Sequence, residues 1–141
     1  MTPPPAPLPT SQAAVARVLY LSLSVSAGAL AALAWFFRGA LSIPDGTGGA
    51  VTFAAYALAA SGLLAGLAFR RLIPERPTTQ DPDRWWRQHL PKAVAVWAIG
   101  EGTVLVGALV LAVGGPTIAA VAVILAGFGV LLATAPSRLA P

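Results

Sequence analysis

Residues 93–113 read AVAVWAIGEGTVLVGALVLAV and hold one ionisable residue, Glu101, near the centre of an apolar run. About 20 apolar residues, rising roughly 1.5 Å each in a helix, match the roughly 30 Å hydrocarbon layer of a bilayer. A carboxylate at that depth costs about 3 kcal/mol or more in lipid. The stretch therefore predicts a transmembrane helix with an acid near the membrane midplane.

Three further apolar blocks of similar length occur along the chain. Hydrophobic residues make up 57% of the 141 residues and charged residues only 10%, which is far from the balance of soluble domains. We expect an all-α integral membrane protein whose four transmembrane helices form two hairpins, with spans at about 18–37, 50–69, 93–113 and 117–135. This transmembrane domain, residues 13–141, follows a Pro-rich flexible tail at residues 1–12.

The connection at residues 70–92 holds most of the basic residues of the chain. The positive-inside rule therefore places this connection and both termini in the cytoplasm, and the protein in a bacterial inner membrane. The net charge of +4 is expected to face anionic membrane lipids, not nucleic acid. The basic residues predicted to lie at this interface are Arg70, Arg71, Arg84 and Arg87.

The same connection contains a helix-start signal. Asp81 can cap a helix, and Pro82 fits the first helical position. A short interfacial helix is predicted from there, ending before Pro91, because proline disfavours helical geometry in the residue that precedes it. Trp85 and Trp86, flanked by arginines, are predicted to lie in the lipid headgroup layer.

Small residues recur at helical spacing in the first three spans. In the third span they repeat every seven residues, which is typical of a left-handed helix-packing interface. We call Gly100, Gly107 and Gly114 the glycine seam and predict that it contacts another transmembrane helix, of a second copy or of a partner subunit. The residues predicted to pack against helices are Ser24, Gly28, Gly62, Gly66, Gly100, Thr103, Gly107 and Gly114.

Few residues in this sequence can carry chemistry. The chain has no cysteine and a single histidine, His89, and it lacks the residue sets of hydrolytic or zinc enzymes. His89 beside two tryptophans fits an amphipathic surface better than a pigment or haem ligand. The sequence predicts no enzyme activity, no metal site and no cofactor, and membrane lipid is the expected non-protein partner.

Residues 97–115, WAIGEGTVLVGALVLAVGG, place the acid between small residues and end in a tight hairpin. The segment resembles the acid-bearing helix of rotary-ATPase proteolipid subunits. It also resembles uncharacterised small four-helix bacterial membrane proteins with the same feature. The first resemblance implies that Glu101 carries an ion.

Three functions are compatible with these features. The first is a non-enzymatic membrane subunit that assembles through small-residue helix faces into a homo-oligomer or a larger energy-transducing complex, with Glu101 as a buried polar anchor. The second is a proton or cation carrier that works by reversible protonation of Glu101. The third, a small dimeric exporter, is less favoured because Trp97 is the one aromatic residue beside Glu101.

Overall fold

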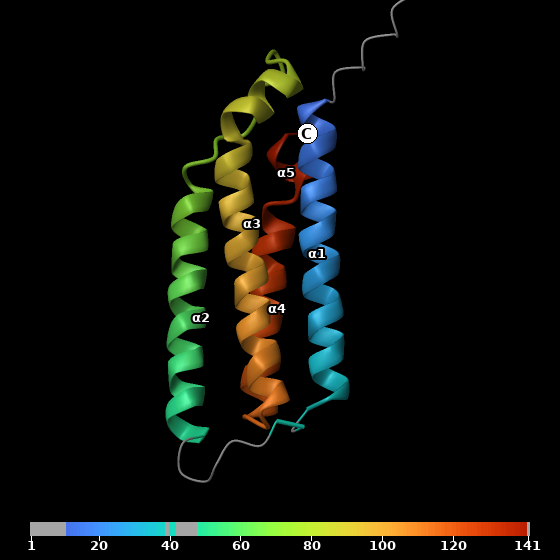
Figure 1. Cartoon of the computed structure of the whole chain (residues 1–141). Helices are drawn as coiled ribbons and strands as arrows, with labels where there is room; N and C mark the ends of the chain where they lie inside the picture. The colour runs from blue at the N-terminus through green and yellow to red at the C-terminus, as the bar shows by residue number, and fades with distance from the viewer. Residues whose placement is uncertain (1–10, 39, 42–47, 141) are drawn as a thin grey trace, which may run out of the picture.

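The computed structural model describes residues 11–38, 40–41 and 48–140, so residues 1–10 of the predicted tail lie outside it. Within the described part the chain is all-helical (Figure 1). Its elements are α1 (Gln12–Phe36), α2 (Gly48–Arg70), α3 (Pro82–Ala112), α4 (Thr117–Ala133) and the single-turn helix α5 (Pro136–Leu139).

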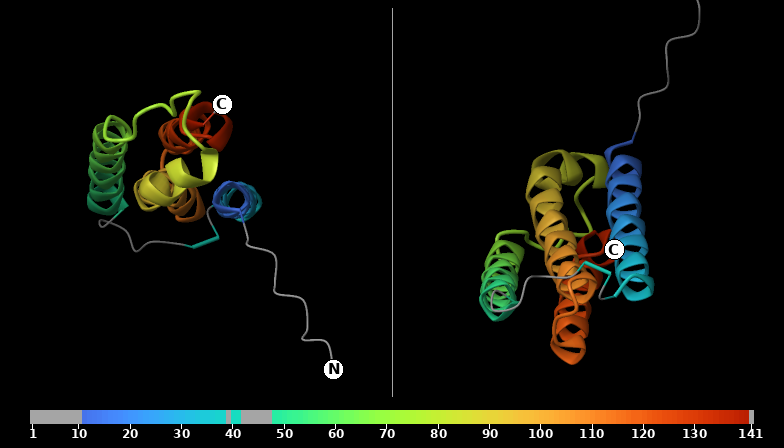
Figure 2. Two further views of the ribbon diagram at one scale, coloured as in Figure 1. Left: turned by 90° about the horizontal axis from the view of Figure 1, so that it is seen from above. Right: turned by 60° about the horizontal axis from the view of Figure 1, so that its bottom comes forward.

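The four long helices form a bundle around α3. α1 and α3 run in the same direction, and α2 and α4 run in the opposite direction (Figure 1). α1, α2 and α4 each pack mainly against α3, and Figure 2 shows α1 and α2 on different sides of it. The start of α1 and the helix α5 lie at the same end of the bundle as the α2–α3 connection (Figure 1). Every other long helix thus depends on α3 for its position.

Helix length and outward-facing residues indicate a membrane-embedded protein. α1, α3 and the Thr52–Arg70 part of α2 are each long and apolar enough to cross a bilayer. α4 is apolar but has 17 residues, or roughly 25 Å of helix. Large apolar side chains stand exposed on the outer surface, including Val18, Leu21, Phe36, Phe53 and Leu64. Such a surface suits lipid rather than water.

α3 and α4 pack closely against each other because glycine lets their backbones approach. A Cβ atom at Gly107 would lie 2.7 Å from Ile124 Cγ1 and 2.8 Å from the Ala120 carbonyl oxygen. A Cβ atom at Gly127 would lie 2.7 Å from the Gly100 carbonyl oxygen. The prediction that the glycine seam serves another subunit is therefore wrong for Gly100 and Gly107, because α4 of the same chain occupies that face.

Gly114 has a different role from the other two seam glycines. It adopts a φ of 75°, a conformation that glycine takes without steric cost, directly after the C-cap residue Val113. The Gly114 N–H donates to the Leu111 carbonyl at 3.1 Å, and the Gly115 N–H donates to the Val110 carbonyl at 2.8 Å. This pair of bonds is a Schellman motif, which ends α3 and turns the chain toward α4.

The predicted helix start at Asp81 is confirmed, but the predicted separate interfacial helix is wrong. The Arg84 N–H donates to the Asp81 carboxylate at 2.8 Å, and α3 then continues without interruption through Pro91. Pro91 lacks an N–H, so one backbone hydrogen bond is lost and the helix can bend there without ending. The first turns of α3 bend toward α1 across the end of the bundle (Figures 1 and 2).

The two tryptophans in these first turns hold the bent segment in place. Trp85 is 1% exposed and Trp86 is 2% exposed, so both indoles are covered by other parts of the chain and have almost no surface free to contact lipid. Their rings contact each other edge to face at 4.9 Å, and Trp86 also lies 6.2 Å from the ring of Trp97. Burying these apolar rings stabilises a helix that Pro91 alone would weaken.

Candidate functional site

Each face of α3 contacts a different neighbouring helix. Gly100, Val104 and Gly107 face α4, whereas Ile99 and Thr103 face α2. The third face carries Trp97, Leu105 and Ala108 and lies against α1. Glu101 follows Trp97 by four residues and precedes Leu105 by four, so it belongs to the α1 face.

Two features of the interface between α1 and α3 lie on either side of Glu101 along the helix axis. On one side, the Tyr20 ring meets the Trp97 ring edge to face, with centroids 5.4 Å apart. On the other side lies a largely apolar groove of about 290 Å³, which we call the α1/α3 groove. It is lined by Leu30, Leu33, Ala34, Phe37, Leu105, Ala108, Leu109 and Ala112. Glu101 lies between these levels, one helical turn from each.

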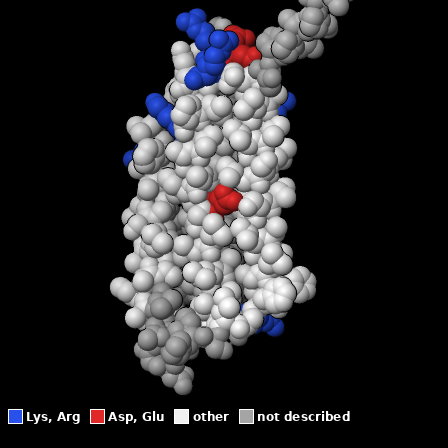
Figure 3. Space-filling view, in the orientation of Figure 1, with Lys and Arg blue, Asp and Glu red and all other residues white. Residues whose placement is uncertain are grey.

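Glu101 is partly buried and has no partner among the described residues. It forms no hydrogen bond or ion pair there, although its carboxyl group has two oxygens that accept hydrogen bonds. Figure 3 shows one acidic patch at mid-height on a face of otherwise uncharged residues, while the basic residues gather near the ends of the bundle. A polar group in this setting gains from a hydrogen-bond partner outside the described residues.

The α2 glycines and Thr103 pack together, away from Glu101. A Cβ atom at Gly62 would lie 3.3 Å from Thr103 Oγ1, and one at Gly66 would lie 3.3 Å from Ile99 Cγ2. The Thr103 hydroxyl donates to the Ile99 carbonyl one turn back at 2.9 Å. These residues join α2 to α3 inside the chain and leave no polar group for a ligand.

The small-residue row of α1 lies mostly free of neighbouring helices. A Cβ atom at Gly28 would meet nothing within 4 Å, so no other described helix lies close to it. Ser24 is partly buried, and its hydroxyl oxygen is buried without a hydrogen-bond partner. Gly28 is therefore open to a helix from outside the chain, whereas the Ser24 hydroxyl is covered by the chain itself.

The residues predicted to lie at the interface have several environments. Arg71, Arg84 and Arg87 are exposed, whereas Arg70 donates to the Ile73 carbonyl at 2.8 Å near the end of α2. His89 stacks on the Trp85 ring with centroids 4.5 Å apart.

One nitrogen of the His89 ring is already engaged. Its Nδ1 lies 2.9 Å from the Trp85 carbonyl oxygen, a position in which a protonated Nδ1 donates. Within residues 11–38, 40–41 and 48–140 no three His, Asp or Glu side chains gather as metal ligands would. His89 is therefore held by its own helix, as a structural residue is.

Sequence reasoning missed two features at this end of the bundle. Trp97 Nε1 donates to the carbonyl oxygen of Thr134 at 2.8 Å, and both residues are buried. Arg17, which the sequence marks only as a basic residue near a helix entry, lines a pocket with Arg76. Spacing could not reveal either pairing, because both join residues far apart in the chain.

The chemistry available at Glu101 is hydrogen bonding and proton binding by one carboxyl group in an apolar setting. No Asp, His, Lys or Arg accompanies it in the apolar parts of the described helices. Such a group can hold a partner helix or take up a proton. In comparisons with protein-family models, curated proteins and solved structures, nothing matches this chain.

Proposed function

We propose that this chain is a non-enzymatic membrane subunit with four transmembrane helices. It assembles with copies of itself, or into a larger energy-transducing membrane complex, through small-residue helix faces and through Glu101. In this proposal α4 is the fourth span, shorter than the others but joined to α3 by a tight hairpin. The resemblance of residues 97–115 to rotary-ATPase proteolipid subunits agrees with a membrane complex of that general kind.

The observation that carries this proposal is the unpartnered carboxyl group of Glu101 on the α1 face of α3. A polar group in an apolar setting gains most from a hydrogen bond that excludes lipid. Glu101 finds no such bond among the described residues. A helix of another chain, laid against the α1/α3 groove, could supply it.

Glycines that no other described helix contacts support the same proposal. The α3–α4 and α2–α3 contacts already use Gly107 and Gly62, but a Cβ atom at Gly28 or Gly129 would have no neighbour within 4 Å. Glycines facing outward in a membrane helix allow another helix to approach closely. The contact surface we propose includes Gly28 on α1 and Glu101 on α3, in place of the glycine seam.

The proposed orientation places the α2–α3 connection in the cytoplasm of a bacterial cell. The described basic residues Arg70, Arg71, Arg84 and Arg87 belong to this connection or to the helix ends beside it, and Figure 3 shows most of the basic surface at that end. The positive-inside rule then gives an inner-membrane protein whose termini face the cytoplasm.

Reversible protonation of Glu101 is the second candidate function. The same lack of a fixed partner favours it, because no hydrogen bond among the described residues holds the carboxyl group in one protonation state. A carrier needs the charged form to be reachable, whereas an anchor needs only a hydrogen bond.

The test is the native mass of the full chain extracted in mild detergent, with identification of every co-purifying chain. The subunit proposal expects an oligomer or a larger complex, and a monomer with no companion would overturn it. Glu101→Gln, which keeps the shape and hydrogen bonding of the side chain, should leave the native mass unchanged. Glu101→Leu should reduce the native mass, whereas Leu64→Ala on the exposed face of α2 should not.

Proton flux into liposomes separates the two candidates. Under the carrier candidate the wild-type chain conducts protons, and Glu101→Gln abolishes the flux while the assembly stays intact. Under the anchor proposal the two proteins give the same flux as empty liposomes.

A further inference from the structure

Glu101 and Ser24 are two polar side chains at one level of the interface between α1 and α3. The Tyr20 and Trp97 rings meet with centroids 5.4 Å apart, which sets the register of the two helices. Ser24 follows Tyr20 by four residues, Glu101 follows Trp97 by four, and both helices run in the same direction (Figure 1). Both polar side chains therefore lie one helical turn beyond the ring contact, on the same side of it.

Neither of these polar groups has a partner in the described part of the chain. The Ser24 hydroxyl oxygen is buried without a hydrogen bond, and the partly buried Glu101 forms no hydrogen bond or ion pair. A polar group among apolar ones costs free energy unless it finds a partner, and an ionised carboxylate costs the most. The interface thus has an acid that no described residue matches.

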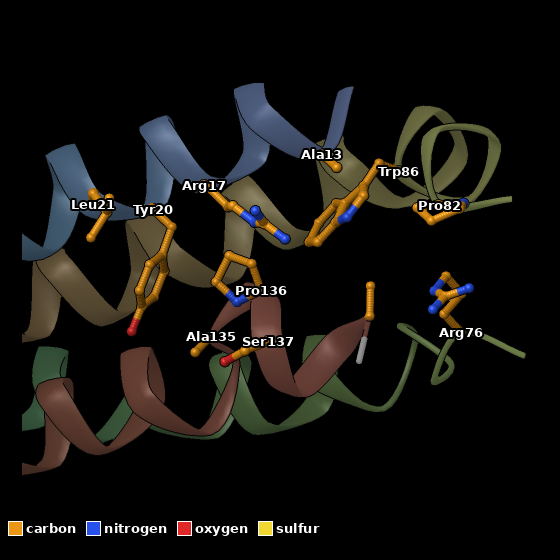
Figure 4. Close-up of a pocket in the computed structure, with 11 residues that line it drawn as sticks. Ala13, Arg17, Tyr20, Leu21, Arg76, Pro82, Trp86, Ala135, Pro136 and Ser137 are labelled. Atoms are coloured by element: carbon orange, nitrogen blue, oxygen red, sulfur yellow. The ribbon is translucent and has the colours of Figure 1, made fainter. Parts of the chain in front are cut away.

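The basic side chains of α1 lie at its two ends and not beside Glu101. Arg17 lines a cavity of about 460 Å³ at the start of α1, and Tyr20, which lines the same cavity, follows it toward the level of Glu101 (Figure 4). At the other end, Arg38 lies over the Trp35 ring, 4.9 Å from its centroid. A cation that pairs with Glu101 must therefore come from outside the described helices.

The α1/α3 groove begins one turn beyond Glu101 and can hold an apolar group. It has a volume of about 290 Å³, and every residue that lines it is Leu, Ala or Phe. Leu105 in this lining follows Glu101 by four residues. Leu33, Phe37 and Leu109 in the same lining are each more than 50% exposed, so the groove is open to the outside of the bundle.

We propose that Glu101 and the α1/α3 groove together bind a lipophilic organic cation, an amphiphile with an ammonium group and an alkyl chain. The ammonium group pairs with the Glu101 carboxylate, and the alkyl chain lies in the groove. The Ser24 hydroxyl, at the same level, is a further hydrogen-bonding group for the pair. This site rests on the part of the proposed function in which Glu101 pairs with a group from outside the chain.

The charge supplies the affinity and the alkyl chain supplies the access. A charge-assisted hydrogen bond is strongest where water is excluded. An alkyl chain gains little by moving from lipid into an apolar groove, because lipid is equally apolar. The chain instead carries the ammonium group to the depth of Glu101, which a small hydrated cation does not reach without the cost of losing its water.

The test is equilibrium binding of radiolabelled octylammonium to the full chain in phosphatidylcholine nanodiscs. Each nanodisc holds one chain, so that no second copy covers the groove, and binding to empty nanodiscs is subtracted. The wild-type chain should bind octylammonium saturably. Octanol has the same alkyl chain without the charge and should compete roughly tenfold or more less well than unlabelled octylammonium. Octanol that competes equally well would overturn the proposal, as would the absence of saturable binding.

Removal of the charge on Glu101 tests its role directly. Glu101→Gln keeps the shape of the side chain but not its charge and should lower the affinity for octylammonium roughly tenfold or more. Glu75→Gln is the matched control, because it removes the same charge from an exposed residue of the α2–α3 connection, and it should bind as the wild type does. Equal affinities in these two variants would overturn the proposal.

A charge-retaining variant guards against a change of fold in Glu101→Gln. Glu101→Asp keeps the carboxylate and should bind octylammonium more tightly than Glu101→Gln does. A Glu101→Asp chain of wild-type helicity that binds no better than Glu101→Gln would contradict the ion pair.

Filling the groove tests where the alkyl chain lies. Leu109→Trp places a larger side chain at a half-exposed position of the groove lining and should weaken octylammonium binding. Leu64→Trp, at an exposed position on α2, is the control and should have no effect. Unchanged binding by Leu109→Trp would contradict the assignment of the groove.

The native mass in mild detergent separates this site from the proposed assembly. Glu101→Gln should keep the native mass and lose octylammonium, because an anchor needs a hydrogen bond whereas the cation needs the charge. A monomeric chain that binds octylammonium would overturn the assembly alone. An assembled chain that does not bind octylammonium in single-chain nanodiscs would overturn the cation site alone.

Discussion

The contacts of α3 with α4 and with α1 differ in how closely the backbones approach. Against α4, glycine lies opposite glycine or backbone, and an added Cβ atom at Gly107 or Gly127 would come within 3 Å of its neighbours. Against α1, contact is made by the Tyr20 and Trp97 rings, and an open groove of about 290 Å³ remains. The α3–α4 interface, the tight one, has no space for another group. The α1–α3 interface, the loose one, leaves room for the Glu101 carboxyl group and for a partner helix.

The largest expected effect tests the tight interface. Gly107→Ala should lower the free energy of unfolding by about 2–3 kcal/mol, because its new Cβ atom would meet Ile124 and the Ala120 backbone at 2.7–2.8 Å. Denaturation of the purified chain in detergent measures the loss. Gly28→Ala is the matched control and should change stability by less than about 0.5 kcal/mol, since nothing lies within 4 Å. Equal losses in the two variants would show that the interfaces do not differ as described.

The next largest loss of stability is expected at Trp97, where α1 and α3 meet through aromatic rings. Trp97→Phe keeps a ring beside Tyr20 but removes the indole N–H that donates to the Thr134 carbonyl at 2.8 Å. A buried carbonyl left without its partner should cost about 1–2 kcal/mol in the same denaturation experiment. Trp35→Phe, at an exposed tryptophan, is the control and should cost far less. A Trp97→Phe chain as stable as the wild type would show that this hydrogen bond does not stabilise the fold.

A smaller effect, an increase in stability, is expected from a substitution at Glu101. In the isolated chain, Glu101→Leu should raise the free energy of unfolding by about 1 kcal/mol, because it replaces an unpartnered, partly buried carboxyl group with an apolar one. The same substitution should weaken assembly. Destabilisation of the isolated chain would show instead that Glu101 has a partner inside its own bundle.

The smallest effect concerns the start of α1. Asp83 joins α3 to α1 through the Ser11 hydroxyl and the Ala13 N–H, both near the surface. Asp83→Ala should cost about 0.5 kcal/mol and should speed amide hydrogen exchange near residues 12–16, with little change in α4. Unchanged exchange there would mean that the other contacts between α1 and α3 hold the start of α1 without these bonds.

Local signals in the sequence predicted much of the fold. Runs of about 20 apolar residues predicted the long helices, Asp81 with Pro82 predicted the start of α3, and Gly114 lies where α3 ends. Each of these depends on residues within a few positions of one another. Helix length and capping are local properties, so a single sequence carries them.

The remaining features depend on contacts between distant segments. Pro91 alone predicts a helix end, yet the buried rings of Trp85 and Trp86 keep the helix continuous. Heptad spacing marks Gly107 as a contact but does not say whether the partner is α4 or another chain. The pairing of Arg17 with Arg76 in one pocket likewise arises only when α1 meets the α2–α3 connection.

The bent start of α3 determines how Glu101 can be reached. Trp85, Trp86 and Trp97 lie in ring contact at that end of the bundle and are buried, so they block a path for water along the axis of the helices. Glu101 instead faces sideways, between α1 and α3. A proton or a hydrogen-bond donor can therefore approach it from the side of the bundle or along the α1/α3 groove, so the chemistry of Glu101 depends on what lies beside these two helices.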